Sequence, residues 1–511
     1  MRVPVLPSSV AGALIALPRV LALYERTYHS SPLAIQPFTI LYRDPSYDPD
    51  NTTLFLVSPT GPAIAQPAPV IYDSTGELVW ADPTIGNTND LNVQTYAGNP
   101  VLTMWVGSGN PGAGPEVGDG IAQIYDETYS LVTNVSAVNG VDGTDFHEFR
   151  IVKPGNTTAL VTAYTPIPAD LSSIGGPVQG WYLNAMFQEI DIATGAVLFN
   201  WSAVEHISLS ESMITIAEFM NGSSAQTAFD AVHINSIDKD TDGHYLISAR
   251  HTWTLYKLNG TDGDGDVIWR LGGKNSSFAN TTADAAFFWQ HDARWHGADT
   301  ISVFDDGAAA FGDAVEIVEE PFGSGKILRL NEEEKTYELV QRFEPFPNAS
   351  PSFAEGSTEL YDSQVVVGYG TNPWITVHDL DTQKVLFSAV IGPNNASLWA
   401  EGAITNYRAY RTTKSVWVGQ PGTAPSIAVD SENGTGTVYV SWNGATQVDR
   451  YVLYTGTTAE TVDTALRTVK RTGFETALSA EGSLGYVRVE ALAVDGRVLG
   501  STEVVGTKLK A

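Results

Sequence analysis

Three histidines and one arginine, widely separated in the sequence, lie in similar surroundings and could together form one reactive site. His147, His233 and His291 each adjoin apolar runs of the kind that form strands, and Arg250 ends another such run. A neutral imidazole can act as a nucleophile or move a proton near pH 7. An arginine fork matches anions that present two or more oxygens, such as sulfate, phosphate or carboxylate. We therefore interpret these four residues as a site that transfers an anionic group.

The composition narrows the chemistry further. The chain has no cysteine, which excludes disulfides, thiolate metal sites and a cysteine nucleophile. We find no obvious carboxylate pair of the kind that glycoside hydrolysis requires. The formal net charge is -30. This argues against nucleic-acid binding, because contacts to phosphates require clustered lysine and arginine. We expect a small aromatic or hydrophobic substrate, no nucleic-acid partner and no cofactor.

Each residue of this constellation also has a structural interpretation. A single histidine in a strand-rich protein is often only a hydrogen-bonded core residue, and His291 could simply pack between Trp289 and Trp295. A zinc site built from three histidines is the rival functional use, although our prediction has no metal. The turn that begins at Asp238 resembles a calcium loop but has Ala249 where the twelfth-position glutamate is required. In an extended strand, His251 should point away from the face that carries its neighbour Arg250.

The elements that must position these residues are strands. A pattern of an apolar strand, a turn that often contains Thr-Gly, and a second strand that often ends in tryptophan recurs six times. Its copies are residues 71–80, 124–133, 190–201, 255–269, 328–340 and 377–387. The alternation and the turn residues are typical of β-hairpins, and further strands lie between the copies. Six such units predict an all-β chain with a six-bladed β-propeller at residues 31–419, whose inner strands would bring the site together.

A second β domain is predicted after the linker-like segment 420–425. Residues 424–511 contain about seven short strands, with Trp442 on the second and Tyr451 and Tyr454 on the third. This arrangement resembles a fibronectin type III β-sandwich. Nothing in this domain suggests catalysis, so we expect it to serve as a packing or spacer module.

Two further features favour the secretory pathway. Residues 1–30 read as a leader or signal-like segment, because an apolar run follows Arg2. This run is too short to predict a stable membrane span. The glycosylation motif Asn-x-Ser/Thr occurs at residues 51, 134, 156, 200, 221, 259, 275, 280, 348, 395 and 433. We therefore predict a secreted, N-glycosylated protein.

Four motifs, in order along the chain, resemble one known family. They are Asp-x-x-His-x-Asn-Ser at 230–236, Ser-x-Arg at 248–250, Ile-Trp-Arg-Leu-Gly-Gly at 268–273 and Gln-His at 290–291. They are similar to motifs of the fungal arylsulfotransferase-like group, which looks related to the bacterial PAPS-independent arylsulfate sulfotransferases. The resemblance covers roughly residues 70–410 and implies a six-bladed propeller. The bacterial enzymes differ, because they carry cysteines and an N-terminal rather than a C-terminal β-sandwich.

The resemblance also implies a reaction and residue roles. His291 looks like a nucleophile that forms a sulfohistidine, and His233 and Arg250 look like ligands of the sulfate oxygens. His147 resembles the remaining histidine, an acid or base. The expected reaction is transfer of a sulfuryl group from an aryl sulfate to a phenol without a nucleotide donor. For contacts to the substrate we predict Asn235, Trp289, Trp295 and Phe146.

Two other functions fit the same sequence. The aromatic residues around the histidines would suit a hydrophobic natural product, so the pocket could catalyse a non-redox step of secondary metabolism such as a cyclisation or isomerisation. Alternatively, the chain could be a non-enzymatic binding propeller with an attached sandwich. Activity on aryl sulfates that depends on His291 distinguishes the first function from these two.

Overall fold

The chain folds almost entirely into β-strands. The computed structural model describes residues 25–47, 52–109, 117–138, 143–216, 220–311, 315–347, 349–395, 400–401, 404–432, 435–481 and 484–507. Within these ranges, helix is limited to α2 (Ala203–His206) and to short 3-10 turns. Those turns are η2 (Ser172–Ile174), η3 (Leu209–Glu211), η4 (Ala225–Thr227), η5 (Arg250–Thr252) and η6 (Ala283–Ala285). None of the helices in this part of the chain has the length and apolar character needed to cross a membrane.

Six sheets make up most of the molecule, and all their strand pairs are antiparallel except β19 (Ala279–Asn280) with β25 (Thr336–Phe343). The first joins distant segments, in the order β32 (Arg408–Val416), β4 (Thr53–Thr60), β5 (Val70–Asp73), β6 (Leu78–Ala81). The second contains β7 (Thr88–Tyr96), β8 (Asn99–Gly109), β9 (Gly118–Tyr125), β10 (Leu131–Val135). The third contains β11 (Phe149–Ile151), β12 (Thr158–Ala169), β13 (Gly180–Asp191), β14 (Val197–Ser202). Apart from β32 in the first sheet, the strands of these sheets follow the up-and-down order in which neighbours in sequence are neighbours in the sheet.

The other three sheets repeat the plan, and the fifth and sixth each have one added strand at the outer edge. The fourth contains β15 (Ile234–Lys239), β16 (Tyr245–Ala249), β17 (Thr254–Leu258), β18 (Val267–Gly272). The fifth has the order β20 (His291–Trp295), β21 (Thr300–Asp305), β24 (Ser324–Asn331), β25 (Thr336–Phe343), β19 (Ala279–Asn280). The sixth has the order β26 (Ser357–Tyr361), β27 (Gln364–Gly368), β28 (Trp374–Asp379), β29 (Val385–Ile391), β3 (Phe38–Arg43).

Small ribbons complete this region. They are β22 (Ala308–Phe311) with β23 (Val315–Val318), β30 (Ala400–Glu401) with β31 (Ile404–Thr405), and β1 (Arg26–Thr27) with β2 (Ala34–Ile35). The six repeats predicted from the sequence all correspond to hairpins formed by the third and fourth strands of a sheet, from β5–β6 in the first to β28–β29 in the sixth. The hairpin prediction is therefore confirmed.

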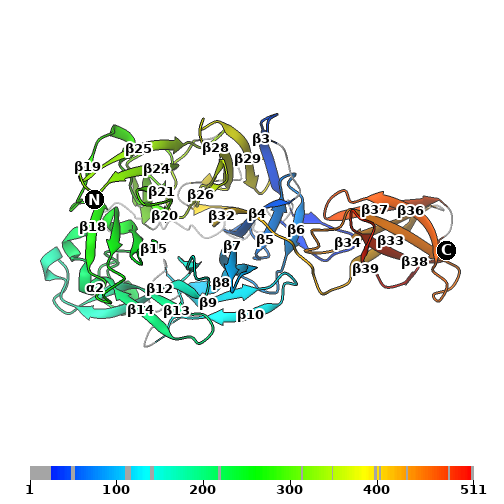
Figure 1. Cartoon of the computed structure of the whole chain (residues 1–511), viewed down its shortest axis with the longest axis horizontal. Coiled ribbons are helices and arrows are strands. Elements are labelled where there is room, and N and C mark those ends of the chain that lie inside the picture. The colour runs from blue at the N-terminus through cyan, green and yellow to red at the C-terminus, as the bar shows by residue number, and fades with distance from the viewer. Residues whose placement is uncertain are drawn as a thin grey trace, which may run out of the picture.

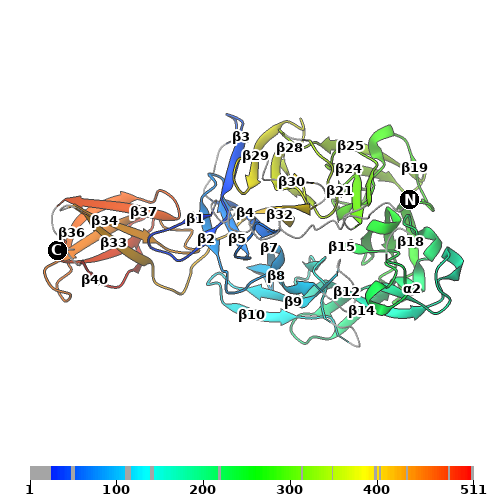
Figure 2. The same ribbon diagram turned by 180° about the vertical axis from the view of Figure 1, so that it is seen from behind.

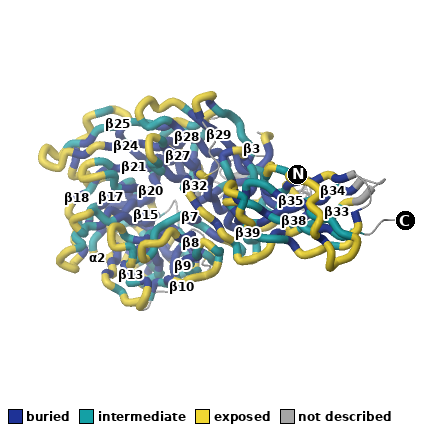
Figure 3. Tube along the Cα trace, turned by 45° about the vertical axis from the view of Figure 1, so that its right-hand side comes forward, coloured by how far each residue is buried: buried dark blue, intermediate teal, exposed yellow. Residues whose placement is uncertain are grey.

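The first strand of each sheet lies toward a common centre (Figure 1). Neighbouring sheets contact one another in sequence: β32 with β7, β7 with β11, β12 with β15, β15 with β20, β20 with β26, and β26 with β32. The two ends of this region each join a sheet made by the opposite end. The early strand β3 pairs with the late strand β29, and the late strand β32 pairs with the early strand β4. The buried parts of the trace gather around the centre and the exposed turns at the rim (Figure 3).

The predicted site residues enter at the same point of successive sheets. His147 lies two residues before β11, His233 lies one residue before β15, and His291 begins β20. In the sixth sheet the corresponding position, two residues before β26, belongs to Glu355. Since all these inner strands start at the same edge, one side chain from each of four sheets is delivered to the same end of the centre.

The C-terminal residues form two facing sheets. One contains β33 (Ser426–Glu432), β34 (Thr435–Ser441) and β37 (Glu475–Glu481). The other contains β36 (Thr464–Lys470), β35 (Arg450–Gly456), β38 (Tyr486–Leu492) and β39 (Val498–Ser501), and β40 (Val505–Gly506) also pairs with β38. A separate cluster of buried residues, including Val440, Trp442 and Tyr451, fills the space between them. In the described residues, eight strands therefore occur where about seven were predicted, because the last predicted strand is divided into β39 and β40.

This sandwich packs against the outer edge of the first sheet, away from the centre (Figures 1 and 2). The Asn443 side chain donates to the carbonyl of Ala81 at 2.8 Å, and the Tyr129 hydroxyl donates to that of Gly444 at 2.9 Å. Residues 1–24 of the expected leader lie outside the described residues. Tyr28 packs on Phe474 of the sandwich, with ring centroids 4.5 Å apart, and Ser30 donates to Glu475.

Candidate active site

Each of the three predicted histidines is held by a buried carboxylate at its Nδ1 atom. His147, His233 and His291 are only 2–3% exposed. Their Nδ1 atoms lie 2.5 Å from Asp145 Oδ1, 2.6 Å from Asp230 Oδ2 and 2.6 Å from Asp306 Oδ2, respectively. A carboxylate accepts hydrogen bonds, so it fixes the ring orientation and favours a proton on Nδ1. The opposite atom, Nε2, is thereby left for chemistry.

His147 and His233 face each other through these Nε2 atoms. The two nitrogens are 3.1 Å apart, and the rings are nearly perpendicular, at 87°. Burial opposes ionisation of Asp145, but His147 and the hydrogen bonds outweigh it, so the pKa of this carboxyl is lowered. The same balance, with His233 and His251, lowers the pKa of Asp230. Both histidines are therefore paired with ionised carboxylates.

His291 has a different environment at Nε2. The backbone N–H of Glu355 donates to this atom at 3.3 Å, so Nε2 is an acceptor and carries a lone pair. Burial and then the positive charge of Arg250 hold the pKa of His291 well below its usual range, while burial raises the pKa of Asp306. The hydrogen bond between His291 Nδ1 and the Asp306 carboxylate requires one proton. Because Nε2 accepts a hydrogen bond, this proton lies on Nδ1. His291 is thus arranged as a neutral imidazole whose unprotonated Nε2 accepts a hydrogen bond from the Glu355 N–H.

Arg250 lies beside the histidines with its guanidinium fixed. Nη1 lies 2.9 Å from His251 Nε2, Nη2 donates to the Phe353 carbonyl at 2.8 Å, and the group lies 5.4 Å from the ring centroid of Trp289. Its backbone N–H also donates to the His233 carbonyl at 2.9 Å. The prediction that Arg250 and His233 meet is consistent with these contacts, and a fixed fork of this kind suits an anion with several oxygens.

The expectation for His251 was wrong. Residues Arg250–Thr252 form the 3-10 turn η5 rather than an extended strand, so adjacent side chains do not alternate between faces. The His251 ring lies 4.7 Å from that of His233, centroid to centroid, and its Nδ1 is 2.7 Å from the Asp230 carbonyl. Burial lowers the pKa of His251 well below its usual range. His251 therefore supports Arg250 and His233 as a neutral ring.

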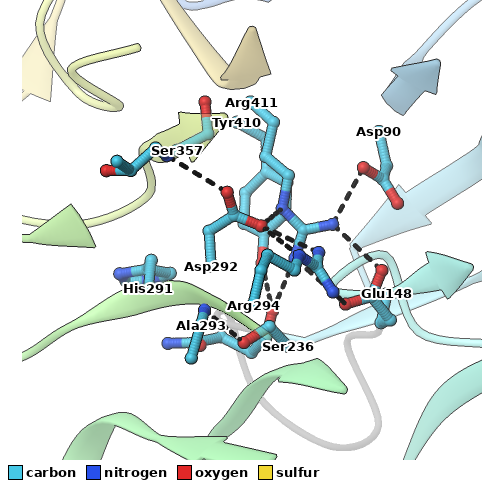
Figure 4. Close-up of polar contacts among 12 residues, drawn as sticks. Asp90, Glu148, Ser236, His291, Asp292, Ala293, Arg294, Ser357, Tyr410 and Arg411 are labelled. Atoms are coloured by element: carbon cyan, nitrogen blue, oxygen red, sulfur yellow. Dashed lines mark hydrogen bonds and ion pairs between the residues drawn. The ribbon is translucent and has the colours of Figure 1, made fainter. Parts of the chain in front are cut away.

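A buried ionic cluster lies close to His291 (Figure 4). Arg294 contacts Glu148 at 2.7 Å and Asp292 at 2.8 Å, and Arg411 contacts Asp90 at 2.8 Å. These residues come from four of the six sheets, since Arg411 lies in β32, Asp90 in β7, Glu148 immediately precedes β11, and Asp292 and Arg294 share β20 with His291. Mutual pairing is what allows such charges to be buried.

Strand β32 connects this cluster to the segments that carry His147 and His233. The Arg411 guanidinium donates to the carbonyls of His147, at 2.9 Å, and Asn235, at 2.8 Å. The Tyr410 hydroxyl lies 3.2 and 3.1 Å from the same two carbonyls. Two neighbouring side chains of β32 thus hold the strand starts that carry His147 and His233.

Several of these strand starts have left-handed backbone. His233, Asp292 and Glu355 have φ of 56°, 55° and 70°. Such conformations cost on the order of 1–3 kcal/mol each outside glycine and persist where the surroundings enforce them. Here they accompany side chains that must turn toward the centre. The energy is offset by the hydrogen bonds and ion pairs of the surrounding cluster.

The residues predicted to contact substrate have different positions. The Asn235 amide donates to the Gln290 carbonyl at 2.6 Å, so this residue also fixes the segment before His291. The Phe146 ring stacks on His147, with centroids 4.2 Å apart. Trp289 is buried beneath Arg250. Trp295 is not brought to the histidines, because it ends β20 and packs against Trp269, 6.0 Å between centroids.

Other residues of the site escaped the sequence analysis. Asp230 stands within a quoted motif, three residues before His233, and Asp145 lies two residues before His147, so closeness in the sequence could have identified both. Asp306 follows the next strand, β21, and reaches His291 only through sheet pairing. No feature of the sequence identified Glu355, because it lies near no other candidate residue along the chain. Its Oε1 lies 3.3 Å from Arg408, while Oε2 is buried without a hydrogen-bond partner among the described residues.

One group in the described part of the chain has metal-ligand spacing. Donor atoms of Asp230, His233 and His251 lie within 4.8 Å of one another. However, His251 has both ring nitrogens in hydrogen bonds to protein atoms, and the positive Arg250 guanidinium lies 2.9 Å from one of them. This donor set is therefore suited to holding Arg250 in place rather than to binding a cation.

Solved structures similar to this chain share little sequence with it. A protein of unknown function from Bacteroides caccae is 15% identical, with 72% of this chain and 99% of that chain covered and a TM-score of 0.38. A putative 6-phosphogluconolactonase from Bacteroides fragilis is 10% identical, with 72% and 100% covered and a TM-score of 0.37. A functionally unknown protein from Desulfotomaculum acetoxidans is 12% identical, with 89% and 98% covered and a TM-score of 0.32. Similarities at this level support no functional conclusion.

No curated protein matches the chain. The model of one protein family does match it, and that family is described as arylsulfotransferase (ASST). The match spans residues 92–391, which is more than half of the chain and includes all three carboxylate-held histidines and Arg250. The chain belongs to the arylsulfotransferase (ASST) family.

Proposed function

We propose that the protein transfers a sulfuryl group from an aryl sulfate to a phenolic acceptor through a sulfohistidine at His291, without a nucleotide donor. The observation that carries this proposal is the lone pair at His291 Nε2, fixed by Asp306 on one side of the ring and by the Glu355 N–H on the other. A nucleophile needs such an electron pair, and the family to which the chain belongs supports this reaction class.

In the first half-reaction, Nε2 of His291 attacks the sulfur of the aryl sulfate. An N–S bond forms while the S–O bond to the aryl group breaks, and the leaving phenolate takes a proton from the His147–His233 pair. Arg250 stabilises the sulfuryl oxygens, which carry the negative charge. Asp306 balances the positive charge that develops on the His291 ring.

In the second half-reaction, the acceptor phenol attacks the same sulfur. Its proton returns to the His147–His233 pair, a new S–O bond forms, and the N–S bond breaks to restore neutral His291. The Phe146 ring beside His147 offers an aromatic surface to the donor and the acceptor. No proton is gained or lost over the complete cycle.

The test is release of nitrophenolate from 4-nitrophenyl sulfate in the presence and absence of phenol. We expect phenol-dependent release that is lost in His291→Ala and retained in His244→Asn, a control histidine in the turn between β15 and β16. Mass spectrometry should detect one added sulfuryl group on His291 when phenol is omitted. Full activity of His291→Ala would contradict the nucleophile, and no release from several aryl sulfates would favour a non-redox reaction on a hydrophobic compound.

We further propose that the six sheets are blades of one closed propeller at residues 31–419, and that residues 424–511 form a fibronectin type III-like module. The sequence of contacts around the inner strands supports the first point. The division of the C-terminal strands into β33-β34-β37 and β36-β35-β38-β39 supports the second. An experimental structure would test both.

We also propose that the protein is N-glycosylated in the secretory pathway. Of the predicted acceptor asparagines in the described residues, those at 134, 200, 221, 275, 280 and 395 are exposed. Accessible side chains are required for glycan attachment. Material from a eukaryotic secretory host should lose mass when treated with an N-glycosidase, and an unchanged mass would contradict the proposal.

A further inference from the structure

The arrangement of His147 and His233 fixes the number of protons in the unoccupied pair. Each Nδ1 faces an ionised carboxylate at 2.5 or 2.6 Å and must donate to it. The two Nε2 atoms are 3.1 Å apart, a distance at which one must donate and the other accept. The pair therefore has one proton between its Nε2 atoms and one lone pair, and its positive charge lies between Asp145 and Asp230.

An anion changes this requirement. The oxygens of sulfate or of a sulfate ester carry no proton near neutral pH, so they can only accept hydrogen bonds. An Nε2 atom that contacts such an oxygen must therefore carry a proton. If both rings turn from each other to the anion, both Nε2 atoms must be protonated, one more proton than the unoccupied pair holds.

We propose that binding of a sulfate-type anion at this site is coupled to the uptake of one proton by the His147–His233 pair. The bound anion supplies the negative charge that stabilises the second proton. That proton is then the one available to the leaving phenolate. This inference relies on the proposed function only for the identity of the anion, and not on the sulfuryl transfer itself.

The surroundings of the pair favour a single proton before the anion arrives. Burial lowers the pKa of His147, against the attraction of Asp145. The charged and titratable groups that face the two rings are Asp145, Asp230, Tyr164, His251, His291, Tyr410 and Arg411. Tyr164 and Tyr410 have raised pKa values because they are buried and stay neutral, and Arg411 adds positive charge that disfavours a second proton.

The sign of the pH dependence follows. Below the pKa for the second proton in the unoccupied pair, both Nε2 atoms are already protonated and anion binding takes up no proton. Above it, each bound anion requires about one proton from solution, and the apparent affinity falls about tenfold per pH unit. A rise in pH thus weakens anion binding at this site.

The experiment is calorimetric titration of the full chain with sodium sulfate at a fixed pH near 7. It is run in two cationic buffers, imidazole and Tris, whose ionisation enthalpies differ and which do not compete as anions. We expect the difference in heat to correspond to uptake of about one proton per sulfate. The double variant His147→Asn/His233→Asn keeps amide donors but should show no uptake, whereas His244→Asn should behave as the wild type.

A second measurement needs no variant. In protein labelled with ¹⁵N in histidine, sulfate should convert one Nε2 signal from the unprotonated to the protonated range. Saturable binding with heats that do not depend on the buffer would overturn the proposal, as would an unchanged Nε2 signal or no sulfate binding. Turnover of aryl sulfates without proton uptake would refute this inference alone, while proton uptake without turnover would refute only the proposed transfer.

Discussion

Replacement of Asp306 by asparagine tests how His291 is activated. The carboxylate lies 2.6 Å from Nδ1, and the imidazole becomes positively charged as Nε2 bonds to sulfur. Two unit charges about 4 Å apart attract by about 4 kcal/mol at an effective dielectric constant of roughly 20. If half to all of this attraction is realised in the transition state, the variant loses about 2–4 kcal/mol. That corresponds to a decrease in kcat of roughly 30- to 1000-fold.

The orientation of the new amide sets which part of this range applies. The Ser352 hydroxyl lies beside the Asp306 carboxyl and opposes the rise in its pKa, and a hydroxyl can accept a hydrogen bond from an amide as well as donate one to a carboxylate. The amide oxygen can therefore turn to Nδ1 and keep its proton in place. We expect loss of the charge alone, and not the decrease of about 10⁴-fold that a wrong tautomer produces in serine proteases.

The assay is the burst of nitrophenolate in a single turnover with 4-nitrophenyl sulfate, which reports formation of the sulfohistidine. The number of protons taken up on sulfate binding serves as the control, because Asp306 does not face the His147–His233 pair. The midpoint of urea unfolding shows whether the variant is folded. A burst rate within about threefold of the wild type, with an intact fold, would refute the charge argument.

Three other predictions follow from the same structure. Arg250→Lys replaces a fork by a point charge and should raise KM for aryl sulfates about tenfold or more; a change in kcat alone would contradict an anion-binding role. Arg411→Met leaves buried carboxylates unpaired and should lower the free energy of unfolding by about 3–5 kcal/mol in urea titrations, so a neutral effect would show that the cluster is not held by this residue. Burial lowers the pKa of His296 and His378 to about 4, whereas the pKa of histidine in the unfolded chain is near 6.5. The contribution of each histidine to folding stability is therefore fully present above pH 6.5, and up to about 3 kcal/mol of it is lost as the pH falls to 4. The loss of stability between pH 6.5 and 4 should be smaller in His378→Gln, and an equal loss would argue against it.

Much of the architecture was readable in the sequence because strand hairpins are local. Alternation of apolar residues and turns such as Asp-Ser-Thr-Gly at 73–76 specify a hairpin within about ten residues, and six of them imply a repeated sheet. The pairing of β3 with β29 and of β32 with β4 joins segments hundreds of residues apart. No local pattern identifies such partners, so the sheet that each terminal segment joins required the structure.

For the site, the sequence by itself determined which groups could react. The quoted motifs contain His233, Arg250 and His291, His147 lies in similar surroundings, and the absence of cysteine excludes a thiolate nucleophile. Their position at the start of inner strands follows from periodicity, which depends only on neighbouring residues. The family relation agrees with that selection.

The tertiary structure decided the state in which those groups meet. It placed Asp306 on His291 from a neighbouring strand, put Glu355 in the sixth sheet where the others have histidine, and turned His251 inward through η5. It also set the 3.1 Å contact between His147 and His233 on which the proton count depends. Protonation, tautomer and charge balance depend on distances of a few ångströms between segments far apart in the chain, and only the folded sheets fix those distances.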